Sequence, residues 1–128
     1  MESLITEGIQ IIVNSSYEEE FSHQEISEYV FSYHIEIANE NDFPVQLISR
    51  KWFVLDSKCE QYEVQGPGVI GEQPIIKQGA NYEYESGTQL TSPIGRMSGY
   101  YIMKKVLTEE KFKVYIPAFD LIAPFILN

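Results

Sequence analysis

The sequence predicts an all-β fold in which two antiparallel sheets pack face to face. Three observations carry this prediction. About eight short apolar runs recur along the chain with the alternation of half-buried strands. Clusters of Gly, Pro, Asn and Asp separate these runs at regular intervals. No segment has the apolar spacing of an amphipathic helix, and 44% of the residues are apolar. That fraction is sufficient for one hydrophobic core.

The clearest predicted strand covers residues 29–37, where five large apolar residues alternate with small or polar ones. One of its faces should lie in the core and the other in water. The following strand, 45–55, mixes apolar and polar residues on both faces, which predicts a bulge or bend within it. Trp52, near the middle of the chain, is expected to pack between the two sheets.

The other expected elements are shorter. We expect further strands at residues 8–13, 59–65, 73–76, 81–85, 96–103 and 111–116, with an irregular final strand over 117–124. Residues 17–27 should form an exposed connection, because Glu18, Glu19 and Glu20 would repel one another on a compact element. Residues 56–58 should form a hairpin turn and 86–95 a second long loop. Residues 1–128 are expected to be one domain, with 1–7 as a flexible N-terminal segment.

Charge is unevenly distributed along the chain. The formal net charge is −10, and residues 1–49 contain ten acidic residues and no Lys or Arg. A negative field of this size repels phosphate backbones and anionic lipids. We therefore expect no nucleic-acid partner and no membrane partner. The simplest role for the acidic residues is solubility.

Cysteine content and the N-terminal sequence indicate the compartment. Cys59 is the only cysteine, so the chain can form no internal disulfide and lacks the thiolate patterns of zinc sites. The N-terminus has neither the basic region nor the apolar core of a signal peptide, and no apolar run approaches the length of a membrane span. We expect a cytoplasmic protein, since a reducing compartment suits this cysteine usage.

Residues 66–71 have the spacing Gly-x-Gly-x-x-Gly of a dinucleotide-binding fingerprint. That fingerprint requires a helix after its last glycine. Here Pro74 biases the preceding residue away from helical geometry, so no helix is expected. Glu63 and Glu72 would also repel a phosphate group. The glycines are better explained by a tight crossing between sheets that needs positive φ angles, stiffened by Pro67.

One alternative for this loop stays open. Exposed backbone N–H groups can form an anion-binding nest without a helix. Such a nest would bind pyrophosphate or a nucleotide through residues 66–71, with Arg50 or Arg96 supplying the counter-charge.

Metal sites and catalytic residues are not expected. His23 and His34 stand far apart and form no ligand-spaced pair. Ser98 is one residue away from the nucleophile-elbow spacing and lies within a predicted strand. Cys59 has a neighbouring lysine but no general base. We therefore expect a protein that is not an enzyme, has no catalytic residues and uses no cofactor.

The chain has nine tyrosines, more than a single core requires. Tyrosine is favoured at interfaces because its ring is apolar and its hydroxyl is polar. We expect some of six tyrosines to lie near the surface: Tyr17, Tyr62, Tyr82, Tyr84, Tyr100 and Tyr101.

Several ordered motifs run from the middle of the chain to its end. They occupy residues 44–48 (PVQLI), 50–52 (RKW), 63–74 (EVQGPGVIGEQP), 86–87 (SG), 97–103 (MSGYYIM) and 116–119 (IPAF). In these motifs the chain resembles the ApaG family of small bacterial proteins, and the resemblance extends from residue 30 to residue 124. It implies an immunoglobulin-like sandwich of about seven to eight strands, close to fibronectin type III modules.

The same resemblance bears on function. Bacterial family members are linked by name to cobalt and magnesium resistance. Eukaryotic relatives contain the domain within F-box and polymerase-interacting proteins, where it resembles a protein-binding module.

We therefore expect a non-enzymatic module that binds a protein partner or a second copy of itself as a homodimer. The binding surface should consist of the loops at 66–72 and 86–95 and the neighbouring strand edges. The residues expected to form it are Gly66, Pro67, Gly68, Gly71, Ser86 and Gly87.

Overall fold

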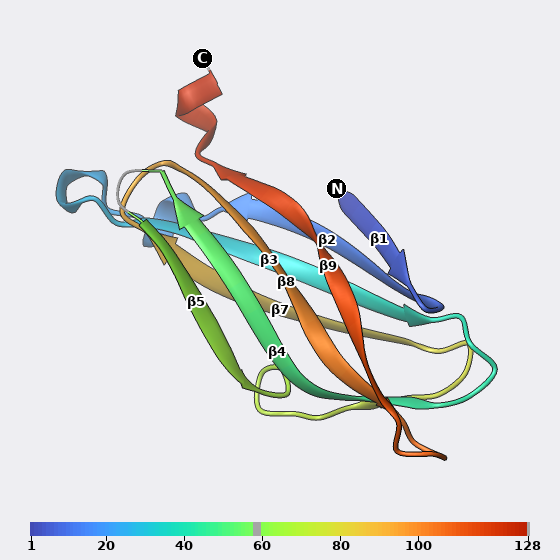
Figure 1. Cartoon of the computed structure of the whole chain (residues 1–128). Helices are drawn as coiled ribbons and strands as arrows, with labels where there is room; N and C mark the ends of the chain where they lie inside the picture. Colours follow the sequence, from blue (N-terminus) through green and yellow to red (C-terminus); the bar gives the residue numbers. More distant parts are fainter. Residues whose placement is uncertain (58–59, 128) are drawn as a thin grey trace.

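The computed structural model describes residues 1–57 and 60–127, and these form two antiparallel sheets packed face to face (Figure 1). The predicted all-β sandwich is confirmed. Within the described residues there are nine strands: β1 (Glu2–Thr6), β2 (Ile9–Tyr17), β3 (Tyr29–Asn39), β4 (Val45–Asp56), β5 (Glu60–Pro67), β6 (Ile75–Ile76), β7 (Asn81–Leu90), β8 (Ile94–Lys105) and β9 (Lys111–Ile122).

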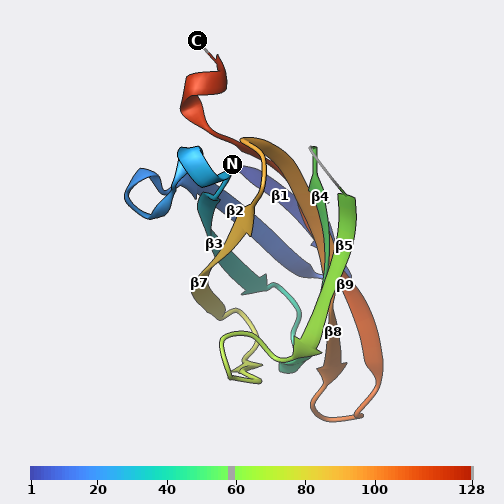
Figure 2. The same cartoon turned by 90° about the vertical axis from the view of Figure 1, so that its left-hand side faces the viewer.

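One sheet has the strand order β1-β2-β3-β7, and the other has the order β5-β4-β8-β9 with the short β6 paired to β4. Figure 2 shows the two layers from the side. On one side of the sandwich, β1 and β2 approach β9. The opposite side is bounded by the edge strands β7 and β5, and the chain that follows β5 crosses there from one sheet to the other.

The core forms where the alternating strands face each other. Phe31, Ile35 and Ile37 on β3 are almost completely buried, as their period of two predicts. Trp52 on β4 is only 3% exposed and packs between the sheets, as expected. Its ring centroid lies 5.2 Å from that of Tyr33 on the opposite sheet and 6.0 Å from that of Phe119 on β9. These edge-on contacts are the geometry that aromatic pairs prefer.

The predicted irregularity in β4 is also confirmed. Its register against β8 shifts between Leu47 and Ser49, which leaves Ile48 as an extra residue in the strand. The shift changes which residues face inward. Leu47 and Trp52 can therefore both point into the core although they are five positions apart, and Arg50 shares the inward side with Trp52.

Several predicted boundaries are wrong, because pairing with a neighbouring strand orders residues that the sequence pattern left outside strands. Residues 14–16 continue β2 because they pair with residues 32–34 of β3. Residues 86–90 continue β7 and pair with residues 29–33 of β3, so the expected loop is only 91–93. Residues 2–6 form β1, paired with β2, in place of the expected flexible segment. Lys58 and Cys59, expected in a hairpin turn and a strand, lie outside the described residues.

Residues 117–122 continue β9 without a break, although the register shifts between Met97 and Gly99 of β8. Pro117, which has no N–H to donate to the ladder, lies opposite this shift. The predicted irregular tail is thus the second half of one strand.

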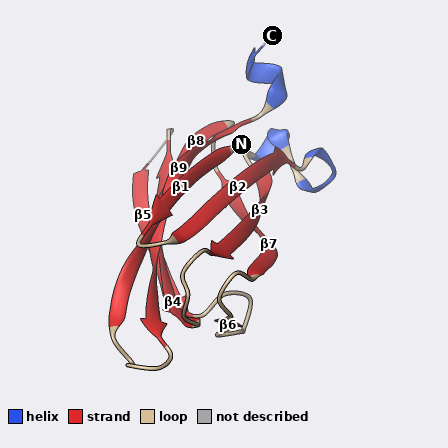
Figure 3. Cartoon of the chain, turned by 90° about the vertical axis from the view of Figure 1, so that its right-hand side faces the viewer, coloured by secondary structure: helices blue, strands red, loops and turns tan. Residues whose placement is uncertain are grey.

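Three short 3-10 helices complete the described chain (Figure 3). The helices η1 (Glu19–Phe21) and η2 (Gln24–Ile26) lie in the predicted exposed connection and contain no buried residue. After β9, η3 (Pro124–Leu127) brings the ring of Phe125 to 6.0 Å from that of Tyr17. No helix in these ranges is long and apolar enough to cross a membrane.

Candidate functional site

The candidate site is the glycine loop, residues 66–74, on the open side of the sandwich. At its tip a tight turn is closed by two hydrogen bonds, from Val69 N to Glu72 O (2.8 Å) and from Glu72 N to Val69 O (2.9 Å). The two central residues, Ile70 and Gly71, have φ angles of 42° and 80°. Positive φ at both central positions is the signature of a type I′ turn. The glycine-rich segment is therefore a small hairpin, as the tight-crossing interpretation requires.

The bulge in β4 anchors this hairpin. The Ile48 carbonyl accepts hydrogen bonds from Gly68 N (2.8 Å) and from Gln73 Nε2 (2.9 Å). Leu47 N donates to Pro74 O at 3.0 Å. The extra residue in the strand thus supplies an acceptor to the loop, and the two irregular segments hold each other in place.

Arg50, on the inner side of β4, is hydrogen-bonded to the start of the loop. Its Nη1 donates to the carbonyl oxygens of Pro67 (3.0 Å) and Gly68 (2.9 Å). Among the described residues no carboxylate pairs with its guanidinium. Beside it is a hollow of about 130 Å³ whose lining is shared by both sheets and the loop. The other lining residues are Tyr33, Trp52, Val69, Ile70, Tyr84 and Ser86.

The tyrosines beneath this hollow remain neutral. Burial raises the pKa of Tyr33, Tyr84 and Tyr101, and the nearby Arg50 charge offsets this only in part. The Tyr84 and Tyr101 hydroxyls are hydrogen-bonded to each other at 2.5 Å within the core. Protonated phenols of this kind are structural donors and acceptors and do not act as bases near neutral pH.

The tyrosines divide between core and surface. Tyr84 and Tyr101 are buried, so neither supplies the surface aromatic area expected of this group. Tyr62 is 41% exposed, as expected for some members of the group. Position in the sheet decides the difference, because Tyr62 lies opposite the buried Val54 but on the edge strand β5.

Several backbone N–H groups of the loop already donate hydrogen bonds within the protein. The N–H groups of Gly68, Val69 and Glu72 all bond to backbone carbonyls, and the carbonyls of Pro67 and Gly68 face Arg50. An anion nest needs successive N–H groups turned outward. Any anion recognised here would therefore rely on Arg50 more than on the loop backbone.

The structure brings some of the expected residues together and separates others. Gly66 and Pro67 end β5, Gly68 and Gly71 lie in the hairpin, and Ser86 reaches the same hollow from β7. Ser86 and Gly87 belong to a strand and not to the predicted second loop, and Gly87 lies on the outer face of its sheet.

Arg96 is not part of this site. It lies on the outer face of β8, where its Nε bonds to Asp120 Oδ1 at 2.8 Å. The inner residue Arg50 and the outer residue Arg96 therefore cannot share one anion at the loop.

Sequence reasoning assigned no specific role to Ile70 or Ile75 and predicted for Tyr82 only a place near the surface. Ile70, at the hairpin tip, is 56% exposed, and Ile75 is exposed to the same degree. The Tyr82 hydroxyl donates to Glu72 Oε2 at 2.9 Å and ties the loop to β7. The available signal was the apolar pair Val69-Ile70 between two glycines, since neighbouring side chains of a tight turn cannot both enter the core.

His23 and Ser98 were considered as a metal ligand and a nucleophile, and the structure describes the surroundings of both. Within the described ranges, no group of three or more His, Cys, Asp and Glu side chains is placed to hold a metal ion. His23 is in an exposed pair with Glu25 at 3.6 Å. Ser98 lies within β8, so the strand–turn–helix setting of a nucleophile elbow is absent there.

Comparison with known proteins decides the family. The profile of the ApaG domain matches residues 19–105. The chain belongs to the ApaG domain family. It is 46% identical over 120 residues to Protein ApaG of Vibrio vulnificus, covering 94% of both chains. It is 44% identical over 126 residues to Protein ApaG of Agrobacterium fabrum, covering 97% of this chain and 95% of that one. The resemblance seen in the sequence motifs is thus confirmed.

Solved structures agree with the observed sandwich. The crystal structure of the Bordetella pertussis protein described as ApaA superposes with a TM-score of 0.86 at 37% identity, covering 91% of this chain and 94% of that one. An Archaeoglobus fulgidus protein superposes with a TM-score of 0.52 at 8% identity, covering 84% of this chain and 94% of that one, which shows likeness of fold alone. The ApaG profile begins after β2 and ends with β8, yet β1, β2 and β9 belong to the same two sheets.

Proposed function

We propose that this ApaG domain is a non-catalytic module that binds a protein partner through the glycine loop and the neighbouring edges of β5 and β7. The loop is hydrogen-bonded to β4 and β7, so it is ordered before binding. A preordered loop loses little conformational entropy when a partner docks. The two free strand edges beside it offer backbone groups for strand addition.

The conformation of Ile70 carries this proposal. A β-branched residue with positive φ is a strong outlier, since the left-handed region costs an L-residue roughly 1–2 kcal/mol. Ile70 also leaves 56% of its surface in water. Neither packing nor turn geometry accounts for isoleucine at this position, whereas contact with a partner would bury it. Strained, exposed residues of this kind are typical of functional sites.

The matching test is Ile70→Asn, which removes the apolar tip and tolerates positive φ. The variant should fold at least as stably as the parent but lose a partner that co-purifies from the native host and binds again as a purified protein. Ile5→Asn, at a position that is 58% exposed on β1, is the matched control and should retain that partner. Retention by both variants would remove the loop as the docking site.

A small-anion function is the second candidate, and one observation favours it. Arg50 faces a hollow without pairing to a described carboxylate, although the chain is strongly acidic. Its free N–H groups could bind pyrophosphate or a nucleotide. Calorimetry with pyrophosphate and ATP, with and without magnesium, tests this. Heat that disappears in Arg50→Gln supports the candidate, and no heat at millimolar ligand rejects it.

The link to cobalt and magnesium resistance belongs to the same proposal. The described residues offer no clustered ligands for a divalent ion. We propose that any effect on cation homeostasis passes through the protein partner. Ile70→Asn in the host should then change cation tolerance as strongly as deletion of the whole gene, while Ile5→Asn should leave tolerance unchanged.

A further inference from the structure

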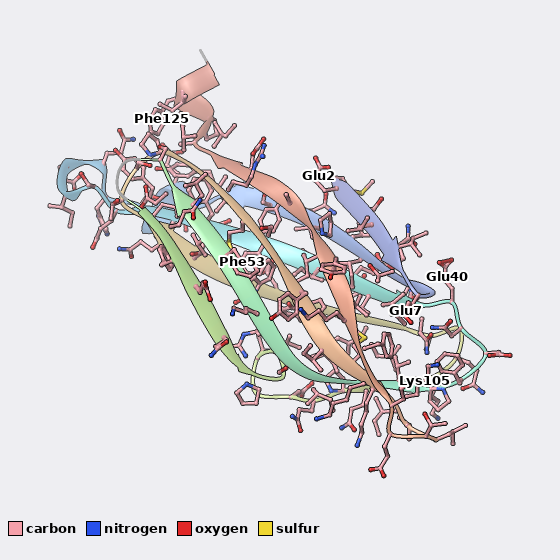
Figure 4. The ribbon with its side chains drawn as sticks, in the orientation of Figure 1. Glu2, Glu7, Glu40, Phe53, Lys105 and Phe125 are labelled. Carbon is pink, nitrogen blue, oxygen red and sulfur yellow. The ribbon has the colours of Figure 1, made fainter. Side chains whose placement is uncertain are left out.

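The outer face of the β5-β4-β8-β9 sheet carries apolar side chains that the core does not use. Phe53, Leu55 and Tyr115 are 39%, 41% and 48% exposed. The ring of Tyr100 lies 6.2 Å from that of Phe53 and 6.4 Å from that of Tyr115, so an aromatic row crosses β4, β8 and β9. Figure 4 shows Phe53 on β4, within the sheet that is nearer the viewer. Exposed aromatic groups of this extent mark interaction surfaces.

A hollow of about 730 Å³ lies beside this row. Phe53 and Leu55 of β4 line it together with Arg96 and Ser98 of β8 and residues 61–63 of the edge strand β5. Ser98 is a small residue between the large side chains of Arg96 and Tyr100 on the same face, which leaves space above the strand. The volume lies within the range of ligand-binding clefts and can accept large side chains.

The charge of this face differs from that of the rest of the protein. Alternation along the strands places five basic and two acidic side chains on it: Lys51, Arg96, Lys104, Lys111, Lys113, Glu63 and Asp120. The outer face of the opposite sheet carries Glu36, Glu83 and Glu85 and no Lys or Arg in its described strands. The sheet face that contains the hollow is therefore locally positive and aromatic, in a chain whose net charge is −10.

We infer that this face binds an extended segment of a protein partner in which carboxylates flank a large apolar side chain. The apolar side chain enters the hollow against Phe53 and Leu55. The carboxylates meet Lys113, whose Nζ lies 4.4 Å from the Tyr100 ring centroid and pairs with no described carboxylate.

The charges within the hollow argue against a polyanion as its occupant. Lys51 Nζ already lies 2.9 Å from Glu63 Oε1, and Arg96 is paired with Asp120. The net charge of the chain also repels a phosphate backbone more strongly than it repels a segment with a few carboxylates. This surface is separate from the glycine loop, so the inference neither requires nor supports the proposed role of Ile70.

The test is a titration of the ¹⁵N-labelled full chain, followed by amide chemical shifts. The first probe is a short capped peptide in which Asp alternates with Phe and Leu. A second peptide replaces Asp with Lys, a third replaces Phe and Leu with Ser, and a thymidine oligonucleotide serves as the polyanion. The first peptide should shift the amides of β4, β5 and β8 near the hollow, and the other probes should bind at least about tenfold more weakly.

Two pairs of variants locate the contact. Phe53→Ser should weaken the first peptide about tenfold, a loss typical of an apolar anchor, while Ile5→Ser should not change its affinity. Lys113→Glu should weaken it, while Lys77→Glu, with the same change in charge at an exposed site, should not. Chemical shifts outside the changed strand show whether each variant remains folded.

Four results with the probes would each overturn the inference. These are no shifts at millimolar peptide, shifts confined to the glycine loop or the opposite sheet, equal binding of the Lys peptide, and tighter binding of the oligonucleotide. Concentration-dependent shifts of the same face without peptide would assign it to a second copy of the chain and equally overturn the inference.

Discussion

Alanine substitutions at Gly68 and Gly71 can measure how rigidly the glycine loop is held. Both have positive φ angles, 58° and 80°. A Cβ added at Gly71 would meet no atom within 4 Å, whereas a Cβ added at Gly68 would lie 2.0 Å from the Glu72 carbonyl oxygen. That oxygen accepts the 2.8 Å hydrogen bond that closes the turn from Val69 N. Alanine at the two positions therefore imposes a similar backbone penalty but different contacts.

The difference can be given a magnitude. Alanine with positive φ costs about 1 kcal/mol at either position. At Gly68 the turn must also open, which removes about two hydrogen bonds worth roughly 1 kcal/mol each. We expect Gly68→Ala to lower the free energy of unfolding by about 3 kcal/mol and Gly71→Ala by about 1 kcal/mol.

Urea unfolding provides the assay. Trp52 is the only tryptophan and lies in the core, so its fluorescence reports global unfolding. The m value should be unchanged in both variants, because the surface exposed on unfolding is the same. Equal losses in Gly68→Ala and Gly71→Ala would show that the loop relaxes freely around an added methyl group. The glycine loop would then not be a preordered docking surface.

Three further predictions concern stability. Asp56→Ala should lower the free energy of unfolding by about 3 kcal/mol, because this buried carboxylate accepts hydrogen bonds from Thr91 N (2.6 Å) and Ser92 Oγ (2.7 Å). Asp120→Ala breaks only an exposed ion pair and should lower it by less than about 0.5 kcal/mol in the same urea assay. Arg96→Gln should likewise change the unfolding midpoint very little, and a large loss would show that the outer-face pair is structural. Burial raises the pKa of Tyr84 and Tyr101, so the folded state keeps protons that the unfolded state loses above about pH 10. Stability should therefore be fully present below that pH and fall as the pH rises, and an unchanged urea midpoint between about pH 9 and about pH 11 would contradict the assignment.

The sequence predicted elements where side-chain pattern alone decides structure. The alternation over residues 29–37 is strong enough to identify β3 and its buried face. The mixed faces of residues 45–55 revealed a bulge, because no regular strand could bury both Leu47 and Trp52. Residues 86–90 look like a loop by composition, yet they extend β7 because the longer β3 offers them backbone partners. Pairing of this kind is a tertiary effect that local propensity does not contain.

The candidate site was only partly predictable for a related reason. The spacing of Gly66, Gly68 and Gly71 identified the loop, and Pro74 correctly excluded a following helix. Arg50 points inward because it lies two residues before the buried Trp52, whereas the outward direction of Arg96 depends on how β8 pairs with its neighbours, so sequence did not separate the two arginines. The exposure of Ile70 follows from the same hairpin geometry, which becomes visible only when Val69 and Glu72 are seen to pair.

The most direct test of the account is photo-crosslinking in the native host from a reactive amino acid placed at position 70. The same amino acid at Glu83, on the outer face of β7, gives the control. Position 70 should capture a specific protein that mass spectrometry identifies and that position 83 does not capture. Capture of the same proteins from both positions, or of none from position 70, would contradict the claim that the glycine loop is a docking surface.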